Sequence, residues 1–326
     1  MALVVLAFAA VLVVRGADAT RPKAGMPAQG RPAARVSSST TAAVSVVGAA
    51  AGLPASWVRI STGPNGGAVW SGLIPNRYAA HEGKSAVYLP PRFSSVHRYP
   101  VLYLLHGLKG SPSSYVRGLH LARVADRMIT SAQITPMIIV IPAGAHSSTA
   151  EWAGPWESFV VRDVVPWVDG RLPTIASPAG RALGGLCAGG YGAMDIGLRH
   201  PGLFGALESW QGYFAPVFRD GPFSHASQRY LNANDPTLLV QHRAAALRRD
   251  GIRFYVSVGG NHELVLRRWS VAFSSLLNRL QIPNRLWQAP AAQRKHFWRA
   301  TMPSALQFAS NAFTRPTVAT RNVGKL

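Results

Sequence analysis

The sequence predicts an α/β fold with a mostly parallel central sheet and helices on both faces. Short β-rich runs alternate with longer helical stretches from residue 56 onward. Two runs, 101–105 (VLYLL) and 137–141 (MIIVI), are continuously apolar, as expected of central strands buried on both sides. The 326 residues are 48% hydrophobic and 9% aromatic, which is enough for a large core and excludes a disordered protein.

The N-terminal segment predicts an exported protein. Residues 2–14 form an unbroken apolar run that Arg15 ends, and an A-x-A pattern follows at 17–19. The run is short for a membrane span but suits a signal peptide, although no positive charge precedes it. Residues 1–19 are therefore expected to be a signal peptide or short anchor, and the protein to be secreted or associated with the cell envelope. Residues 20–55, rich in Ala, Ser, Pro and Arg, are expected to form a linker.

The folded domain is expected to span residues 56–313, followed by a basic tail over 314–326. Strands are predicted where β-branched and aromatic residues cluster, and helices in the longer stretches between them. The predicted strands are 56–61, 67–73, 84–89, 100–105, 136–142, 180–186, 204–209, 252–258 and 284–288. The predicted helices are 113–131, 157–169, 189–200, 236–250, 264–280 and 298–312.

The composition is strongly basic. The chain has 34 Lys and Arg against 13 Asp and Glu, a formal net charge of +21, and no acidic residue follows Glu263. Such a charge favours an anionic neighbour, and an anionic cell-envelope surface fits the expected export. No nucleic-acid-binding module is present in the sequence, so no specific nucleic-acid partner is expected. A single cysteine excludes an intramolecular disulfide, and without a phosphate-binding loop, dinucleotide fingerprint or metal-binding helix motif no cofactor is expected.

Residues 185–189 (GLCAG) predict a sharp strand-to-helix turn with a nucleophile at its apex. The pattern is G-x-nucleophile-x-G, with Cys187 where serine is usual. Gly185, Gly189 and Gly190 provide the clearance that lets the helix pass close to the strand. A helix N-terminus behind Cys187 would lower the pKa of its thiol. The alternative is a small buried cysteine in the same turn without reactivity.

A second motif lies upstream at 99–110 (YPVLYLLHGLKG), where a hydrophobic strand ends in His-Gly and a glycine-containing loop. Such loops supply one backbone N–H of an oxyanion hole, and the residue after the nucleophile supplies the other. The hole is therefore expected to consist of the amides of Leu108 and Ala188. His106 is expected to orient the loop rather than to transfer protons.

Three blocks in order, 88–115, 156–174 and 180–214 (GRALGGLCAGGYGAMDIGLRHPGLFGALESWQGYF), resemble the esterase family of α/β-hydrolases. That family includes esterase D-like enzymes and the secreted mycobacterial mycolyltransferase antigens. The resemblance covers about residues 80–313. It implies the α/β-hydrolase fold, acyl-ester chemistry and a triad in the order nucleophile, acid, histidine.

The resemblance leaves the triad open. Cys187 matches the family serine, but the usual acid position holds His262, with Glu263 beside it. Gapless matching of 290–298 places Gln293 where the family has its histidine, and glutamine cannot act as a general base. Three alternatives follow: a Cys187–Glu263–His296 triad, a direct Cys187–His262 pair, or no working triad.

Other prominent residues are expected to serve mainly in the structure or in lining the site. Glu157 and Asp163 are expected to cap a helix or form ion pairs. Four aromatic residues are candidates for either an acyl pocket or the core: Trp152, Trp156, Trp210 and Tyr213. Residues 213–235 show no periodicity and are expected to form a cap over the site.

The sequence thus predicts an exported acyl hydrolase or acyltransferase whose substrate is a lipid or cell-envelope ester. The alternative is a catalytically impaired homologue that serves as a binding or structural protein of the envelope. The sequence predicts no oligomeric state.

Overall fold

The computed structural model describes residues 52–79, 83–144, 151–218, 221–259, 264–289 and 296–313. All of them belong to one compact unit that spans residues 39–326. The predicted signal peptide, nearly all of the predicted linker and the basic tail lie outside the described residues. Within the described residues, no helix is both long enough and apolar enough to cross a membrane.

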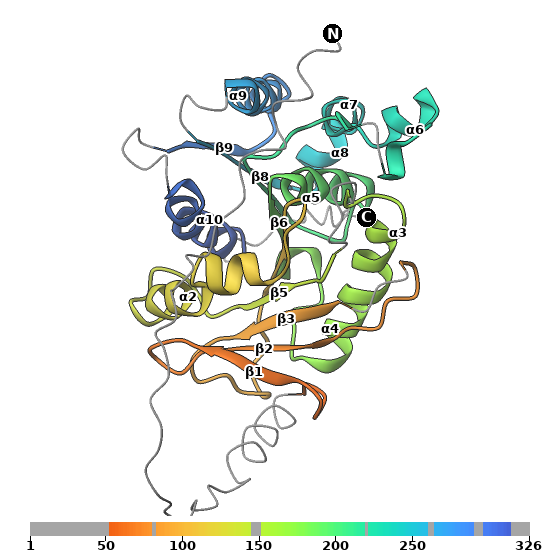
Figure 1. Cartoon of the computed structure of the whole chain (residues 1–326). Coiled ribbons are helices and arrows are strands. Elements are labelled where there is room, and N and C mark those ends of the chain that lie inside the picture. Colours follow the sequence, from red (N-terminus) through yellow and green to blue (C-terminus); the bar gives the residue numbers. More distant parts are fainter. Residues whose placement is uncertain are drawn as a thin grey trace, which may run out of the picture. The chain divides into compact units, whose positions relative to one another are not determined.

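Nine strands of the described residues form one sheet in the order β1-β2-β3-β5-β4-β6-β7-β8-β9 (Figure 1). The strands β4 to β9 are parallel, whereas β1, β2 and β3 join them in antiparallel pairs. This confirms the prediction of a mostly parallel sheet. The bounds are β1 Val58–Thr62, β2 Ala68–Leu73, β3 Lys84–Leu89, β4 Val101–Leu105, β5 Ile138–Ile141, β6 Arg181–Leu186, β7 Ala206–Trp210, β8 Arg253–Val258 and β9 Asn284–Gln288.

The apolar runs predicted as central strands occupy the middle of the sheet. In β4, Tyr103 packs into one hydrophobic cluster and Leu102 and Leu104 into another, because successive side chains point to opposite faces. Both clusters are fully covered, so every residue of β4 and β5 is buried. The nine predicted strands all match observed strands to within two residues at either end.

Helices cover both faces of the sheet (Figure 1). One face packs against α2 (Leu121–Thr130) and α10 (Phe297–Phe313). The other face packs against η3 (Phe159–Val164), α4 (Val165–Arg171), α5 (Ala188–Arg199), α7 (Pro236–His242), α8 (Ala244–Arg249) and α9 (Leu264–Arg279).

Two predicted helices are broken in the structure. The predicted helix 113–131 is a π-helical turn at η2 (Ser114–Gly118) followed by α2, because His120 between them has φ +57°, which no α-helix tolerates. The predicted helix 236–250 is split at Arg243 into α7 and α8. The predicted helix 157–169 starts earlier, with α3 (Pro155–Ser158), and runs on through η3 and α4. The sequence prediction missed α6 (Gln228–Ala233).

Packing begins before the predicted domain boundary. Leu53 is only 2% exposed and belongs to the main core cluster, although it lies inside the segment predicted as a linker. Trp57 is buried and stacks on Trp167 with 5.2 Å between ring centroids. The folded part therefore reaches at least to Leu53.

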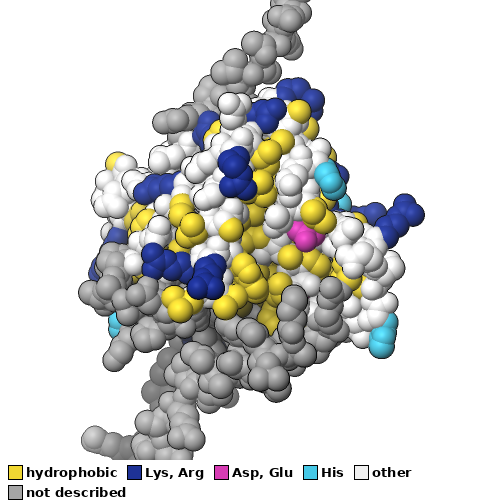
Figure 2. Space-filling model, turned by 90° about the horizontal axis from the view of Figure 1, so that it is seen from above, with side chains coloured by type: hydrophobic (Ala, Val, Ile, Leu, Met, Phe, Trp, Pro, Cys, Tyr) yellow, Lys and Arg dark blue, Asp and Glu magenta, His cyan; other side chains and the backbone are white. Residues whose placement is uncertain are grey.

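The surface is more basic than the net charge implies. Of the nine acidic residues in the described part of the chain, six are buried: Asp126, Glu151, Glu157, Asp163, Asp195 and Glu208. Figure 2, which views the molecule from the β9 and α9 end, shows Lys and Arg spread over this face among hydrophobic side chains, with little acidic surface. A surface of this kind favours anionic neighbours.

Candidate active site

The predicted elbow is present, with Cys187 at its apex between β6 and α5. Its backbone has φ +51° and ψ −113°, a conformation that costs a non-glycine residue about 1–3 kcal/mol. The Cys187 amide donates to the Trp210 carbonyl at 3.1 Å, and its own carbonyl accepts from the amides of Gly190 and Tyr191. The thiol is half-buried at the N-terminus of α5.

Close backbone contact explains the glycines around the elbow. A Cβ on Gly189 would lie 2.0 Å from the carbonyl oxygen of Leu105, at the end of β4. A Cβ on Gly185 would lie 2.3 Å from the backbone of Gly189. Both positions therefore require glycine, as the sequence pattern predicted.

The loop after β4 lies against the elbow. A Cβ on Gly107 would lie 3.4 Å from the Cβ of Cys187. Leu108, Ala188 and Cys187 all pack in one apolar cluster, so the structure brings these three predicted residues together. Ala188 is the first residue of α5, whose leading N–H groups have no partner within the helix. The oxyanion hole itself stays a prediction.

His106 holds this loop in place. Its Nδ1 lies 2.9 Å from the Gly107 carbonyl oxygen, and its Nε2 accepts from the Gly144 amide at 2.9 Å. The Gly144 bond requires an unprotonated Nε2, so the proton of the neutral ring is on Nδ1 and is donated to Gly107. Trp152 packs edge-on against the ring and donates from Nε1 to the His106 carbonyl at 2.8 Å. These contacts match the predicted orienting role.

Cys187 packs against an apolar cluster. Its buried members are Ala153, Ala188, Tyr191, Tyr213, Phe223, Leu231 and Leu266, and Leu108, Cys187, Val217, Phe218, Ala226 and Tyr230 pack against them. More than half of these residues come from 213–235, the segment predicted to form a cap. Of the four aromatic candidates, Tyr213 belongs to this cluster of described residues, whereas Trp152, Trp156 and Trp210 pack in the two clusters that flank the sheet.

Tyr213 adds one polar contact to this apolar wall. Its ring stacks on Tyr191 with 5.0 Å between centroids, and its hydroxyl donates to Glu151 Oε1 at 2.5 Å. Burial first, and then the charges of Glu151 and Cys187, raise the pKa of Tyr213 well above its usual value, so the hydroxyl stays protonated. The sequence offered no signal for this contact, because the two partners are 62 positions apart.

The acid and base candidates are only partly described. His296 is exposed and directly precedes α10. The ring of the next residue, Phe297, lies 3.4 Å from a Cβ built on Gly259, which follows β8. His296 therefore lies at the carboxyl edge of the sheet, as Cys187 does. His262, Glu263 and Gln293 lie outside the described residues, so the three triad alternatives stay open. Within the described part of the chain, no cluster of three metal-ligating side chains occurs.

The acidic residues expected to have structural roles form ion pairs. Asp163 accepts from Arg77 Nε at 2.6 Å. Glu157 contacts Arg199 at 3.0 Å and His200 at 2.6 Å. These contacts confirm the ion-pairing interpretation and join α3, η3 and α5 to their neighbours.

A buried carboxyl group lies beneath the elbow. Glu208 in β7 is fully buried and accepts from Trp210 Nε1 at 2.7 Å. Burial raises the pKa of Glu208 to about 8, and the Trp210 bond opposes this in part. Since the Trp210 carbonyl also holds the amide of Cys187, Glu208 supports the backbone of the elbow.

Glu208 is expected to make the free energy of unfolding fall as pH rises. Unfolded, its pKa is near 4.5, so between about pH 5 and 8 the unfolded chain is ionised while the folded chain stays protonated. Across this window the free energy of unfolding of the wild type should therefore fall by up to about 1.4 kcal/mol per pH unit relative to that of Glu208→Gln. Urea unfolding of both proteins at several pH values measures the difference. If the difference in free energy of unfolding between the two proteins stays constant between about pH 5 and 8, the raised pKa of Glu208 is contradicted.

The profile of the Esterase family, described as "Putative esterase", matches residues 78–307. The chain belongs to this esterase family. An esterase of Mycobacterium tuberculosis is 33% identical over 134 residues, which are 39% of this chain and 28% of that protein. The MPT51/MPB51 antigen of Mycobacterium bovis is 32% identical over 83 residues, 24% of this chain and 27% of the antigen.

Solved structures that are similar to this chain confirm the fold. A ferulic acid esterase aligns with a TM-score of 0.65 and 23% identity, covering 75% of this chain and 98% of its own. The expected α/β-hydrolase fold is therefore present. The alignments with the two curated relatives span less than a third of the length of either relative.

Proposed function

We propose that this member of the esterase family processes carboxylic esters through an acyl thioester on Cys187. The observation that carries the proposal is the position of the thiol at the N-terminus of α5, half-buried beside the loop of Leu108 and an apolar cluster. Helix N-termini stabilise thiolates, and the thiolate is the nucleophilic form of cysteine.

The reaction has two steps. The Cys187 sulfur attacks the ester carbonyl carbon, a C–S bond forms, the C–O bond breaks, and the alcohol leaves with the thiol proton. Water, or an acceptor alcohol in a transferase, then attacks the thioester carbonyl, releases the acid or new ester, and returns the proton to sulfur. The amides of Leu108 and Ala188 would stabilise the negative oxygen in both steps.

The substrate carries an apolar acyl group in this proposal. The cluster beside Cys187 is built of aromatic and aliphatic side chains, among them the stacked pair Tyr191 and Tyr213. Such a lining favours long apolar or aromatic acyl chains. Similarity to a ferulic acid esterase agrees with an aromatic acyl group. A lipid or envelope ester would fit the expected export.

Export is part of the same proposal. The apolar run 2–14 with the A-x-A pattern supports secretion or anchoring to the envelope. The basic surface would then face an anionic envelope. Cell fractionation that finds full-length chain with Met1 in the cytosol would contradict this.

Turnover of simple esters is expected to be weak, because Gln293 occupies the sequence position of the family base. This observation also favours the second candidate function, an envelope binding protein that retains the fold without efficient catalysis. In both cases the backbone oxyanion hole should survive, since it needs no side chain.

The test uses p-nitrophenyl acetate and longer-chain p-nitrophenyl esters on the full chain. We expect intact-mass spectrometry to show one acyl group on Cys187 in the wild type and none in Cys187→Ala, with slow release of p-nitrophenol. Cys187→Ser reports whether sulfur is required. If no adduct forms and the wild type is as inert as Cys187→Ala, the binding-protein alternative replaces the enzyme proposal.

If turnover is fast, the histidine variants identify the general base. If the wild type turns over rapidly and Cys187→Ala abolishes this, the prediction of weak turnover is wrong. His262→Ala and His296→Ala then separate the two histidine arrangements, because only the variant that lacks the base should lose activity.

A further inference from the structure

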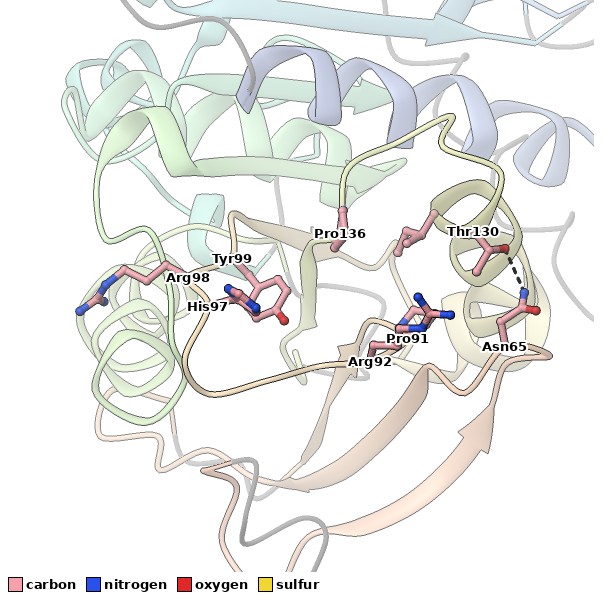
Figure 3. Close-up of a pocket in the computed structure, with 9 residues that line it drawn as sticks. Asn65, Pro91, Arg92, His97, Arg98, Tyr99, Thr130 and Pro136 are labelled. Carbon is pink, nitrogen blue, oxygen red and sulfur yellow. Dashed lines mark hydrogen bonds between the residues drawn. The ribbon is translucent and has the colours of Figure 1, made fainter.

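A second concave site lies at the sheet edge opposite Cys187. It is a cavity of about 810 Å³, and we call it the basic pocket (Figure 3). Its lining includes Asn65 from the β1–β2 turn, Arg92 and His97 from the loop after β3, Tyr99 before β4, and Thr130 at the end of α2. Because β4 runs from this edge to the loop of Leu108, its five residues separate the two sites by roughly 16 Å.

The pocket is positively charged. Three of its nine lining residues are basic, namely Arg92, His97 and Arg98, although the Arg98 guanidinium points away from the pocket, and among the described residues that line it none is acidic. Buried Asp126 contacts the lining residue Asn65: its oxygens accept from the amides of Asn65 and Gly67 and from the Tyr88 hydroxyl. The Asp126 carboxylate therefore stabilises the β1–β2 turn through these hydrogen bonds.

The walls are preformed. The Asn65 side chain donates to Thr130 Oγ1 at 3.1 Å, which joins the β1–β2 turn to α2. On the other side, Tyr99 is buried and stacks on Phe93 with 5.1 Å between ring centroids. The Tyr99 hydroxyl oxygen accepts from the Ser94 amide, so the hydroxyl proton is left to be donated to another group. A rigid site loses less conformational entropy when a ligand binds.

Arg92 has the strained backbone that often marks a binding site. Its φ is +56°, in the left-handed region that residues with a side chain rarely adopt. Figure 3 shows Arg92 on the side of the pocket with Asn65 and Thr130, and His97 beside Tyr99. Arg98 projects away, where Nη1 donates to the Thr174 carbonyl. Strain of this kind concentrates at ligand sites.

We propose that the basic pocket binds a phosphate group, held by Arg92 and His97 with the hydroxyl of Tyr99 as a further donor. The Thr130 hydroxyl donates to the Asp126 carbonyl and only shapes the wall. Guanidinium groups pair with phosphate through two charge-assisted hydrogen bonds. The phosphate belongs to a small organic phosphate or to a lipid headgroup. Val96, 83% exposed in the same loop, and Ile175, 38% exposed and bonded to the Tyr99 carbonyl, provide apolar contacts beside the pocket for a lipid.

The experiment has two arms on the full chain. Isothermal titration with glycerol phosphate measures binding of a soluble phosphate, and cosedimentation with phosphatidylglycerol vesicles, against pure phosphatidylcholine vesicles, measures binding of lipid. The test variant is Arg92→Gln with His97→Gln. The matched control is Arg279→Gln with His242→Gln, which removes the same residue types from exposed positions at the ends of α9 and α7.

We expect the test variant to bind glycerol phosphate at least about tenfold more weakly, and the control to bind as the wild type does. Loss of vesicle binding in the test variant alone identifies a lipid headgroup, whereas unchanged vesicle binding identifies a soluble phosphate. Equal glycerol phosphate binding by the test variant and the wild type, or no binding by the wild type, overturns the proposal. Acylation of Cys187, measured in parallel, should be unchanged, so failure of this proposal is distinct from failure of the esterase proposal.

Discussion

Gln293→His is expected to raise multiple turnover of p-nitrophenyl esters by about 100- to 10,000-fold, the usual contribution of general acid–base catalysis. Gapless matching to the family pattern places Gln293 at the base position. A histidine there could take the thiol proton, pass it to the leaving alcohol and then activate water for thioester hydrolysis. Steady-state release of p-nitrophenol, compared with the burst of one equivalent, measures the effect on each step.

The control is Gln293→Asn, which changes the side chain without adding a titratable group and should stay as slow as the wild type. Gln293→His in a Cys187→Ala background should also stay inert. If Gln293→His changes neither step while Cys187 is still acylated, the histidine position in this chain differs from the family pattern. His296, three residues further along, would then be the candidate to examine.

Gly189→Ala is expected to lower the free energy of unfolding by about 3–5 kcal/mol. The new Cβ would meet the carbonyl oxygens of Leu105 at 2.0 Å and His106 at 2.8 Å. Both obstacles are backbone atoms, so α5 must move away from β4. That movement would also carry Cys187 away from the loop of Leu108. Urea unfolding followed by tryptophan fluorescence measures the loss.

Gly170→Ala is the matched control. Gly170 lies in α4, and a Cβ there meets nothing within 4 Å. Alanine should therefore leave the protein as stable as before or stabilise it by up to about 1 kcal/mol, since it is the better helix former. Equal stability of the Gly189→Ala and Gly170→Ala proteins would show that the elbow is not packed as described.

Local pattern was enough for the strands and for the elbow. The β4 and β5 runs could be predicted because a strand buried on both faces needs apolar residues at every position. Gly185 and Gly189 could be predicted because the close passage of helix and strand excludes any Cβ. The apolar runs and the glycine-rich turn are each visible as a short local pattern, even though the atoms that exclude a Cβ at Gly189 belong to Leu105, 84 positions earlier.

Helix continuity could not be predicted in the same way. His120 breaks the predicted helix 113–131 with φ +57°. Histidine adopts a left-handed backbone more often than most residues, but too rarely for a single histidine to predict a break. The break at Arg243 is similar, because neither glycine nor proline marks it. Both breaks therefore became visible only in the folded chain.

The sequence by itself determined the sheet, the cysteine at the elbow and the resemblance to esterases, all of which depend on neighbouring residues. Only the tertiary structure decided that Tyr213 joins Cys187 in the apolar cluster while the three candidate tryptophans serve the core. The same holds for the Tyr213–Glu151 bond and for the basic pocket, which collects residues from four separate segments. Their partners meet only after the chain folds, and contacts between distant positions leave no periodic trace in a single sequence.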